Sequence, residues 1–318
     1  MKSLLYFFLV AFLANNNLRA QDGKILSKEL LVITDSTTRR IDSLDATISK
    51  DLKKVNLYRI QYLSDGLKVV GFMAEPKEKG KYPCIIANRG GRWNFGLWKP
   101  FLVAFYLGRM ASWGYVAVAS QYRGSSDGGE GKEEYGGKDL NDVFNLIPLL
   151  SHIPNADTSR IGMYGESRGG MMTYLALKRS CRFKAAVVVA GMADCFDVIK
   201  KRPELEDRTF RDLIPNYTRN KEIALKERSA IFWPEQMCKT TPLLIMQGSA
   251  DWRVDASQAM QLVEKLYQYK HPVRFVLYEG ADHTITEFEK EMLLECKRHF
   301  DYYVRDDKPL PNLKPHGQ

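Results

Sequence analysis

The sequence has few of the features that mark metal-dependent, nucleotide-binding or nucleic-acid-binding proteins. Its five cysteines are widely spaced and include no Cys-x-x-Cys pair, so we predict no zinc site. It has no P-loop, no Gly-x-Gly-x-x-Gly after a predicted strand and no His-Glu-x-x-His. Acidic and basic residues are mixed along the chain, without a lysine–arginine block. We therefore expect no metal, no other cofactor and no nucleic-acid partner.

The chain also lacks an apolar run of the length that spans a membrane. The run from Leu4 to Ala14 has 11 residues, whereas a membrane-spanning helix needs about 20. Lys2 precedes this run, and a short polar stretch then leads to Ala20. This is the order of a secretory signal peptide. The sequence therefore predicts that residues 1–20 direct export to the periplasm or the exterior, without a stable membrane span.

The rest of the chain has the composition of a protein with a substantial core. Its 318 residues are 45% hydrophobic and 27% charged, which is ordinary for a globular domain. From residue 57 onward, strand-like runs open with a hairpin at Ser64-Asp65-Gly66 and then alternate with helical segments. The predicted strands are 57–63, 67–74, 84–87, 115–119, 160–164, 185–190, 242–246 and 273–278. This alternation predicts an α/β fold with a mostly parallel twisted sheet and helices on both faces.

The alternation is interrupted at two places, which sets the predicted domain organisation. Residues 191–240 are charged and carry scattered aromatic residues after a core strand, so we predict a small helical cap over the sheet edge. Residues 21–54 are predicted to form an N-terminal helical extension outside the core. The catalytic domain is then 55–306, and 307–318 is a tail.

The clearest chemical motif is Gly165-Glu166-Ser167-Arg168-Gly169-Gly170. It follows a short apolar strand and opens a helix, which is the setting of a nucleophile elbow. The turn at such an elbow is so tight that the residues flanking the serine must be small. The motif therefore predicts that Ser167 is a nucleophile held clear of the sheet edge in an α/β-hydrolase fold.

A serine hydroxyl needs a base to take its proton, and the base needs a group that orients it. In this fold the partners follow in the order Ser, Asp, His. Asp251 comes directly after the predicted strand at 242–246, and His283 follows the last predicted strand. Both lie at the carboxyl ends of their strands, where such sheets hold their active sites. We therefore predict a Ser167–Asp251–His283 triad, with His152, His271, His299 and His316 as weaker candidates for the base.

The negatively charged intermediate of such a reaction also needs an oxyanion hole. One donor is expected to be the backbone N–H of Arg168, directly after the nucleophile. The second is expected from the loop Asn88-Arg89-Gly90-Gly91, which follows an early strand and whose glycines let the backbone approach a substrate. We therefore assign Arg168, Arg89 and Gly90 to the predicted oxyanion hole.

Five stretches, in this order, resemble the catalytic domain of the prolyl oligopeptidase family of serine peptidases. They are Asn88-Arg89-Gly90-Gly91, Gln121-Tyr122-Arg123-Gly124-Ser125, Asp157 to Gly170, Gln247 to Val254, and Gly280 to His283. The resemblance implies an α/β-hydrolase fold and cleavage of short peptides through an acyl-enzyme. It departs from the family pattern at Arg89, where the family usually has His or Tyr, and at Gln247, which replaces a His.

The resemblance leaves the substrate class open. The chain has no room for the β-propeller of the larger members, and small members without one include esterases as well as peptidases. Carboxylic ester hydrolysis, on acyl or sugar-linked esters, is therefore the alternative to peptide cleavage. A hydrolase fold reused as a non-catalytic binding module is a further alternative, which the loss of a triad member would favour.

Several residues near the predicted loops are candidates for binding a small-molecule or short-peptide substrate. Arginines there could hold a carboxylate, and aromatic residues could form the floor of an acyl or sugar site. A rim of solvated charges explains the same residues equally well. The candidates are Arg92, Trp93, Tyr122, Arg123 and Trp252.

The cysteines leave one possible disulfide open. Cys84 and Cys296 lie in apolar segments and are predicted to be core residues. Cys195 and Cys238 could pair in an oxidising compartment, although their spacing alone does not establish a bond.

Overall fold

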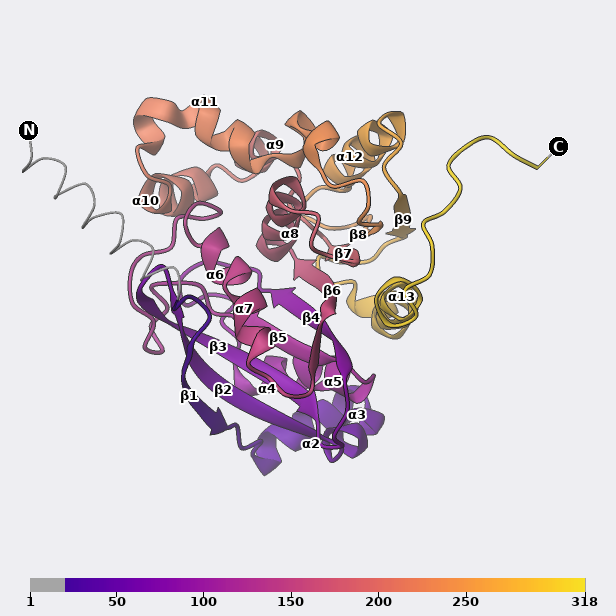
Figure 1. Ribbon diagram of the computed structural model, residues 1–318. Helices are drawn as coiled ribbons and strands as arrows, with labels where there is room; N and C mark the ends of the chain where they lie inside the picture. The colour runs from indigo at the N-terminus through magenta and orange to yellow at the C-terminus, as the bar shows by residue number, and fades with distance from the viewer. Residues whose placement is uncertain (1–20, 318) are drawn as a thin grey trace, which may run out of the picture.

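The computed structural model describes residues 21–317, in which nine strands form one sheet (Figure 1). The strand order is β1-β2-β3-β5-β4-β6-β7-β8-β9. The strands are β1 Ile25–Leu30, β2 Val55–Ser64, β3 Leu67–Pro76, β4 Tyr82–Asn88, β5 Val116–Ser120, β6 Ala156–Glu166, β7 Ala185–Val189, β8 Leu243–Gly248 and β9 Val273–Tyr278. The pairs β1–β2, β2–β3 and β3–β5 are antiparallel. The remaining neighbours in this order, from β5 through β4 to β9, pair in parallel. The prediction of a mostly parallel sheet is confirmed.

Helices cover both faces of this sheet. On one face α6, α7, α8, α9, α11 and α12 share a hydrophobic cluster with the strands, and on the other α2, α3, α5 and α13 do so. The helices are α2 Asp35–Leu44, α3 Ala46–Leu52, α4 Pro100–Leu102, α5 Arg109–Ser112, α6 Leu140–Phe144, α7 Leu146–Ser151, α8 Arg168–Arg179, α9 Cys195–Lys201, α10 Arg211–Leu213, α11 Tyr217–Arg228, α12 Ala256–Gln268 and α13 Glu289–Phe300. Among the residues described, none of these helices is both long and apolar enough to cross a membrane.

The central strands are buried on both sides. In β4, Cys84 and Ile86 belong to one hydrophobic cluster while Ile85 and Ala87 belong to the other, and all four are 0% exposed. Because successive side chains of a strand point to opposite faces, such a strand reads as a continuous apolar run rather than an alternating one. This pattern places the sheet at the centre of the molecule.

The N-terminal segment differs from the prediction in two respects. Residues 21–54 were expected to form only helix, but they also contain β1, which pairs with β2 at the edge of the sheet. They were expected to lie outside the core, yet Ile41 of α2 and Ile48 of α3 are 0% and 3% exposed in the second cluster. The sequence does not predict this strand because most of its side chains are exposed. An edge strand held mainly by backbone pairing shows little hydrophobic alternation. The signal-peptide prediction concerns residues 1–20, which lie outside the described residues.

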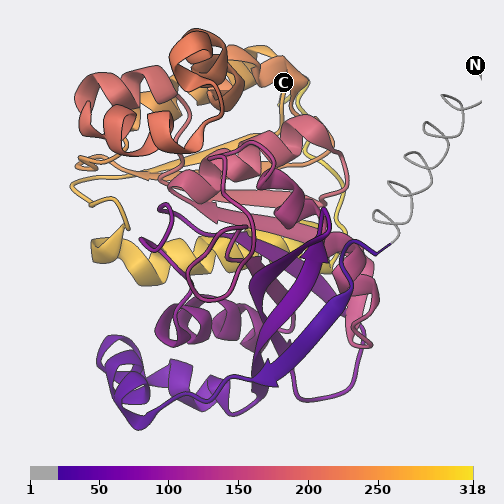
Figure 2. The same cartoon turned by 90° about the vertical axis from the view of Figure 1, so that its left-hand side faces the viewer.

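The segment 191–240 connects β7 to β8 and contains α9, α10 and α11. In Figures 1 and 2 these helices lie at the opposite end of the molecule from α2 and α3. The segment packs against α8 and α12 through its short 3-10 turns at Ala230–Phe232 and Pro234–Gln236. Phe210 and Leu225 are 0% exposed, so the segment contributes its own part of the core.

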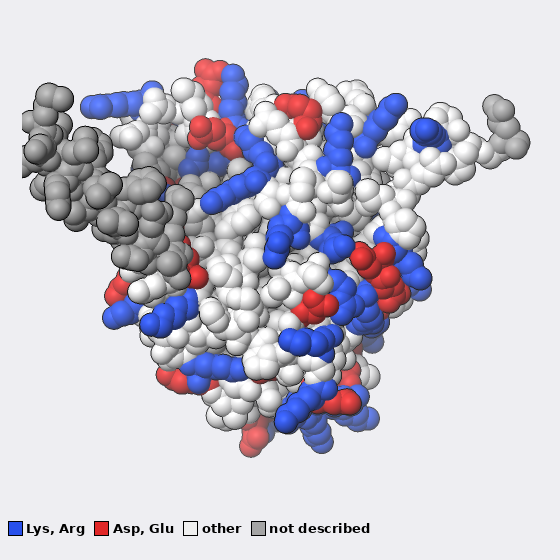
Figure 3. Space-filling model, viewed as in Figure 1, with Lys and Arg blue, Asp and Glu red and all other residues white. Residues whose placement is uncertain are grey.

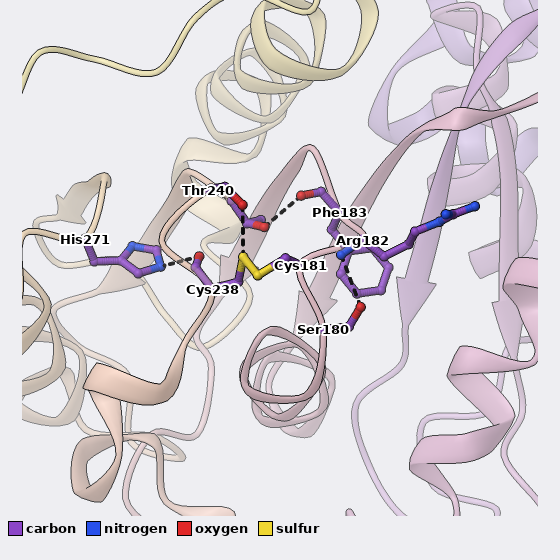
Figure 4. The surroundings of a disulfide bond; sticks show 8 residues. Ser180, Cys181, Arg182, Phe183, Cys238, Thr240 and His271 are labelled. Carbon is purple, nitrogen blue, oxygen red and sulfur yellow. Dashed lines mark hydrogen bonds between the residues drawn. A yellow bond between two sulfur atoms is a disulfide. The ribbon is translucent and has the colours of Figure 1, made fainter.

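A disulfide ties the end of this segment to the rest of the sheet domain, but not through the predicted pair. Cys238 is bonded to Cys181, which follows α8, with 5.2 Å between their Cα atoms (Figure 4). The backbone N–H of Cys238 also donates to Leu177 of α8. Cys195 is a free, buried thiol at the start of α9. The Cys195–Cys238 pairing that the sequence left open does not occur, because pairing depends on which parts of the chain meet in space.

Candidate active site

Ser167 lies on the turn between β6 and α8, in a backbone conformation that non-glycine residues rarely adopt. Its φ is 57° and its ψ is −122°, which is the strain expected at a nucleophile elbow. A Cβ on Gly165 would lie 2.2 Å from the Gly169 carbonyl oxygen, and a Cβ on Gly169 would lie 2.0 Å from the Asn88 carbonyl oxygen. The two glycines are therefore required by close backbone approaches at this turn.

A chain of hydrogen bonds connects the three predicted residues. The Oγ of Ser167 lies 2.9 Å from Nε2 of His283, and Nδ1 of His283 lies 2.7 Å from Oδ2 of Asp251. Asp251 follows β8 and His283 follows β9. When Nδ1–H donates to the carboxylate, Nε2 is left as an acceptor for the Ser167 hydroxyl. This arrangement can remove a proton from Ser167 and hold it on the imidazole.

The carboxylate of Asp251 is fixed by three further donors. Its Oδ1 accepts from the backbone N–H groups of Arg253 and Val254 at 2.8 and 3.0 Å. Its Oδ2 also accepts from Nε2 of Gln247 at 2.9 Å, and the same amide donates to the Val254 carbonyl at 3.0 Å. Gln247, which departs from the family pattern, therefore orients the carboxylate that orients His283.

Gly90, which the sequence assigns to the oxyanion hole, lies against Ser167. A Cβ on Gly90 would lie 3.2 Å from the Ser167 Cβ and 3.8 Å from its Oγ. Among residues 21–317, no backbone carbonyl of a turn, loop or cap accepts a hydrogen bond from the N–H group of Gly90 or of Arg168. The loop is held in place by Asn88, whose side-chain amide donates to Thr173 Oγ1 of α8 at 3.0 Å.

The side chains of Arg89 and Arg168 point away from this site into a buried charge cluster. Arg89 donates to the carbonyls of Gly90, Trp93, Phe95 and Gln121, so its guanidinium braces the loop rather than facing a substrate. Burial, together with Arg168, lowers the pKa of Arg89 to about 10. Arg168 pairs with Glu133 at 2.6 Å and Asp139 at 2.5 Å. The side chain of Arg89 is therefore not available to an oxyanion, and its assignment to the oxyanion hole stays a prediction for its backbone alone.

Two of the predicted substrate-binding residues are structural instead. Arg123 is 5% exposed and makes several hydrogen bonds to Asp142, and it also pairs with Asp65 at 2.7 Å. Tyr122 is 0% exposed and its hydroxyl donates to the Arg89 carbonyl at 3.2 Å. Their assignment to substrate was wrong because their partners lie far along the chain, where sequence spacing gives no signal.

The other three predicted substrate-binding residues lie at the surface. Trp93 is 38% exposed and has the Arg92 guanidinium 4.9 Å from its ring. Trp252 is 67% exposed and has Arg202, from the segment 191–240, 5.1 Å from its ring. None of the three lines the cavity beside Ser167.

A cavity of about 230 Å³ opens beside Ser167 and His283. Its walls are mostly apolar and aromatic, with one carboxylate that sequence reasoning missed, although Glu166 is a neighbour of the nucleophile within the motif. The residues new to the site are Phe95, Leu102, Tyr106, Tyr164, Glu166 and Thr284, and Trp98 and Arg253 also line it. Among residues 21–317, no group of three or more histidine, cysteine or acidic side chains is arranged to hold a metal ion.

The fold and this geometry define a serine hydrolase of the α/β-hydrolase class. The sequence pattern of the prolyl oligopeptidase family, Peptidase_S9, matches residues 98–307, and the chain belongs to this family.

Similar proteins are peptidases by name. The chain is 33% identical over 231 residues to the uncharacterized peptidase YtmA of Bacillus subtilis, covering 72% of this chain and 86% of that protein. It is 26% identical to dipeptidyl-peptidase 5 of Porphyromonas gingivalis, covering 67% of this chain but 32% of that one. Among solved structures, Pyrococcus horikoshii acylaminoacyl peptidase superposes with a TM-score of 0.68 at 24% identity, over 85% of this chain and 46% of that one. This last likeness concerns the fold.

Proposed function

We propose that this protein is an exported serine peptidase that cleaves short peptides through a Ser167–Asp251–His283 triad. The observation that carries the proposal is the continuous chain from the Ser167 hydroxyl through His283 to the Asp251 carboxylate, at 2.9 and 2.7 Å. Membership of the serine peptidase family supports the same chemistry.

The proposed reaction forms and then hydrolyses an acyl-enzyme. His283 Nε2 takes the proton of Ser167 as Oγ attacks the scissile carbonyl, and the resulting oxyanion accepts from the N–H groups of Arg168 and Gly90. His283 then donates that proton to the leaving group as the bond breaks. A water molecule, deprotonated by His283, releases the acyl group and restores Ser167.

Short peptides are proposed as substrates for two reasons. The names of similar proteins include dipeptidyl-peptidases and acylaminoacyl peptidases, and the cavity beside Ser167 has about 230 Å³, which is small for a ligand site. Carboxylic ester hydrolysis uses the same catalytic groups, so the first experiment must distinguish ester cleavage from peptide cleavage.

Export is supported by the disulfide as well as by the N-terminal sequence. Disulfides persist in oxidising compartments and are rare in the cytosol, and Cys181 is bonded to Cys238. Sequencing the N-terminus of the protein recovered from the periplasm or medium tests this proposal, with a new terminus near Gln21 expected. Recovery of only the full-length protein in the cytosol would contradict it.

The defining experiment compares p-nitrophenyl acyl esters with short-peptide amides as substrates. We expect Ser167-dependent cleavage of both, with kcat lowered by at least about 10³ in Ser167→Ala and the thermal midpoint almost unchanged. Labelling of the wild type, but not the variant, by a fluorophosphonate gives a second readout. Cleavage of esters alone would assign the protein to the esterases, and undiminished turnover in Ser167→Ala would refute the triad.

A further inference from the structure

Glu166 places a carboxylate in the wall of the cavity beside Ser167. It is the last residue of β6 and directly precedes the nucleophile. Its Oε2 accepts from the hydroxyl of Tyr106 at 3.1 Å. Within residues 21–317, no lysine or arginine nitrogen lies within ion-pair distance of it. Among the described residues, the carboxylate therefore has neutral hydroxyl groups beside it and no cation within ion-pair distance.

Glu166 is half-buried, and it contrasts with the fully buried carboxylates near the elbow. Glu133 and Asp139 each pair with Arg168, and Asp142 pairs with Arg123. A buried charge is expensive unless it is paired and hydrogen-bonded. Unlike these three carboxylates, Glu166 has no arginine or lysine partner among the described residues, so a counter-ion for it would have to be a bound ligand.

The walls around Glu166 are aromatic and incompletely satisfied. The rings of Trp98 and Tyr106 have centroids 6.1 Å apart, and those of Tyr106 and Tyr164 are 6.0 Å apart. The indole N–H of Trp98 is buried and has no hydrogen-bond partner among residues 21–317, and the hydroxyl of Tyr164 lies beside the Glu166 carboxylate. Aromatic rings tolerate a cation at their faces, so an aromatic lining beside a carboxylate is compatible with a positively charged group.

The charges around the cavity agree with this. Burial raises the pKa of Glu166 above its usual value, and the lowering effects of His283, the Tyr106 hydroxyl and Arg253 do not offset it. Arg253, which lines the same cavity, instead directs its guanidinium over the rings of Trp252 and Phe95, at 5.3 and 5.9 Å. A cation bound in the cavity would therefore add the compensation that Glu166 lacks.

The position of His283 decides which part of a substrate enters. His283 and Thr284 line this cavity together with Ser167. The leaving group must lie within reach of His283 Nε2, because that nitrogen protonates it as the bond breaks. Because both His283 and Thr284 line the cavity, we assign it to the leaving-group side of the scissile bond.

We propose that this cavity binds a primary ammonium group on the leaving-group part of the substrate, with Glu166 as its counter-ion and specificity-determining residue. In a peptide, this corresponds to a basic side chain just after the scissile bond. The assignment of this group to the leaving group rests on the proposed function, whereas binding of an ammonium group in the cavity can be measured without catalysis.

Binding is tested first, in the Ser167→Ala background. The affinity of benzylammonium is compared by calorimetry with that of benzyl alcohol, which has the same shape and no charge. We expect benzylammonium to bind at least tenfold more tightly, and Glu166→Gln to remove that difference. Equal affinities, a preference that survives Glu166→Gln, or no detectable binding of benzylammonium would each overturn the proposal.

Glu279→Gln is the matched control. Glu279 is an exposed carboxylate on the loop that carries His283, and it makes no ion pair or hydrogen bond within the described part of the chain. We expect this variant to keep the wild-type preference for benzylammonium. A preference lost equally in both variants would indicate general electrostatic attraction and would overturn the assignment to Glu166.

Catalysis is tested separately with two acetate esters, of 4-(aminomethyl)phenol and 4-(hydroxymethyl)phenol. We expect the wild type to favour the ammonium ester in kcat/KM by at least tenfold, and Glu166→Gln to reduce this ratio to near one. If hydrolysis does not depend on Ser167, the proposed function fails while the binding result stands. If hydrolysis depends on Ser167 but the ratio is unchanged in Glu166→Gln, only the ammonium site fails.

Discussion

At the scale of single residues, one buried carboxylate links both sides of the candidate oxyanion hole. Glu133 is 2% exposed and lies 2.6 Å from Arg168 and 3.7 Å from Arg89. Arg168 also donates to the Gly91 carbonyl at 3.0 Å. Burial raises the pKa of Glu133, but the guanidiniums of Arg168 and Arg89 outweigh it, and the pKa lies below its usual value. Glu133 is therefore ionised and positions the two backbone segments relative to each other.

Replacing Glu133 by Gln should lower both stability and catalysis. The amide leaves two buried arginines less compensated, and removal of one partner of such a pair costs about 3 kcal/mol. We also expect kcat per folded molecule to fall at least tenfold with little change in KM, because Arg168 and the loop carrying Gly90 are no longer held in register. Urea unfolding and steady-state kinetics measure the two effects.

Glu134→Gln provides the comparison for this variant. Glu134 is the next residue, and its carboxylate pairs with the exposed Lys138 at 3.9 Å rather than with the buried cluster. It should be close to wild type in both measurements. A Glu133→Gln enzyme with wild-type kcat would show that the cluster supports stability alone.

At the scale of elements, the site is assembled at the ends of three parallel strands, and one disulfide links the segment before β8 to the end of α8. Ser167, Asp251 and His283 each follow a strand, β6, β8 and β9, and the carboxyl ends of parallel strands lie at one edge of the sheet. The segment between β7 and β8 returns to the sheet beside α8, where Cys238 is bonded to Cys181 (Figure 4). The two bonded cysteines are 57 residues apart in the sequence.

Thiol counting distinguishes this disulfide from the alternative pair. The unfolded, unreduced protein should expose the thiols of Cys84, Cys195 and Cys296, and Cys195→Ser should lower the count by one. With a Cys195–Cys238 bond the same variant would raise the count instead, because it would free Cys238. Cys181→Ser should destabilise the fold by about 3 kcal/mol.

Helix α13 carries a histidine that should make the fold sensitive to acid. Burial lowers the pKa of His299 to about 4, and its Nε2 lies 3.2 Å from the Pro242 carbonyl. The unfolded chain binds this proton near pH 6.5, so the stabilising contribution is complete above that pH and is lost as the pH falls towards 4.

We expect the wild type to lose about 2 kcal/mol of unfolding free energy through this group between pH 7 and pH 5. His299→Gln can keep the donor to Pro242 but has no titrating group, so its loss over the same range should be smaller. Urea titrations at each pH measure the difference, with His316→Gln in the exposed tail as the comparison. Identical pH profiles for the wild type and His299→Gln would contradict the assignment.

At the scale of the whole molecule, the N-terminal segment is part of the folded unit. Strand β1 completes one edge of the sheet, and Ile41 and Ile48 are buried under the same sheet face as α13.

On the face shown in Figure 3, lysines and arginines are interspersed with acidic residues around a largely uncharged band. The net charge of +9 is thus not gathered into a single patch on that face.

Deleting residues 24–54 should therefore lower the thermal midpoint substantially. Loss of two buried isoleucines alone removes about 4 kcal/mol of burial, and the edge of β2 becomes exposed. Deleting residues 309–318 should change little, since residues 309–317 are exposed. Similar midpoints for the two truncated proteins would show that the N-terminal segment is dispensable for folding.

The sequence alone determined the strand and helix alternation and the ordered positions of Ser167, Asp251 and His283, which the structure brings within hydrogen-bond distance. Those features are local, because apolar runs, a tight Gly-x-Ser-x-Gly turn and strand-end loops each occupy a few neighbouring residues. Only the tertiary structure decided the partner of Cys238, the burial of Arg123 and the exposure of Glu166 to the cavity. Each depends on groups from distant parts of the chain meeting at one point, and such meetings leave no pattern in the neighbouring residues.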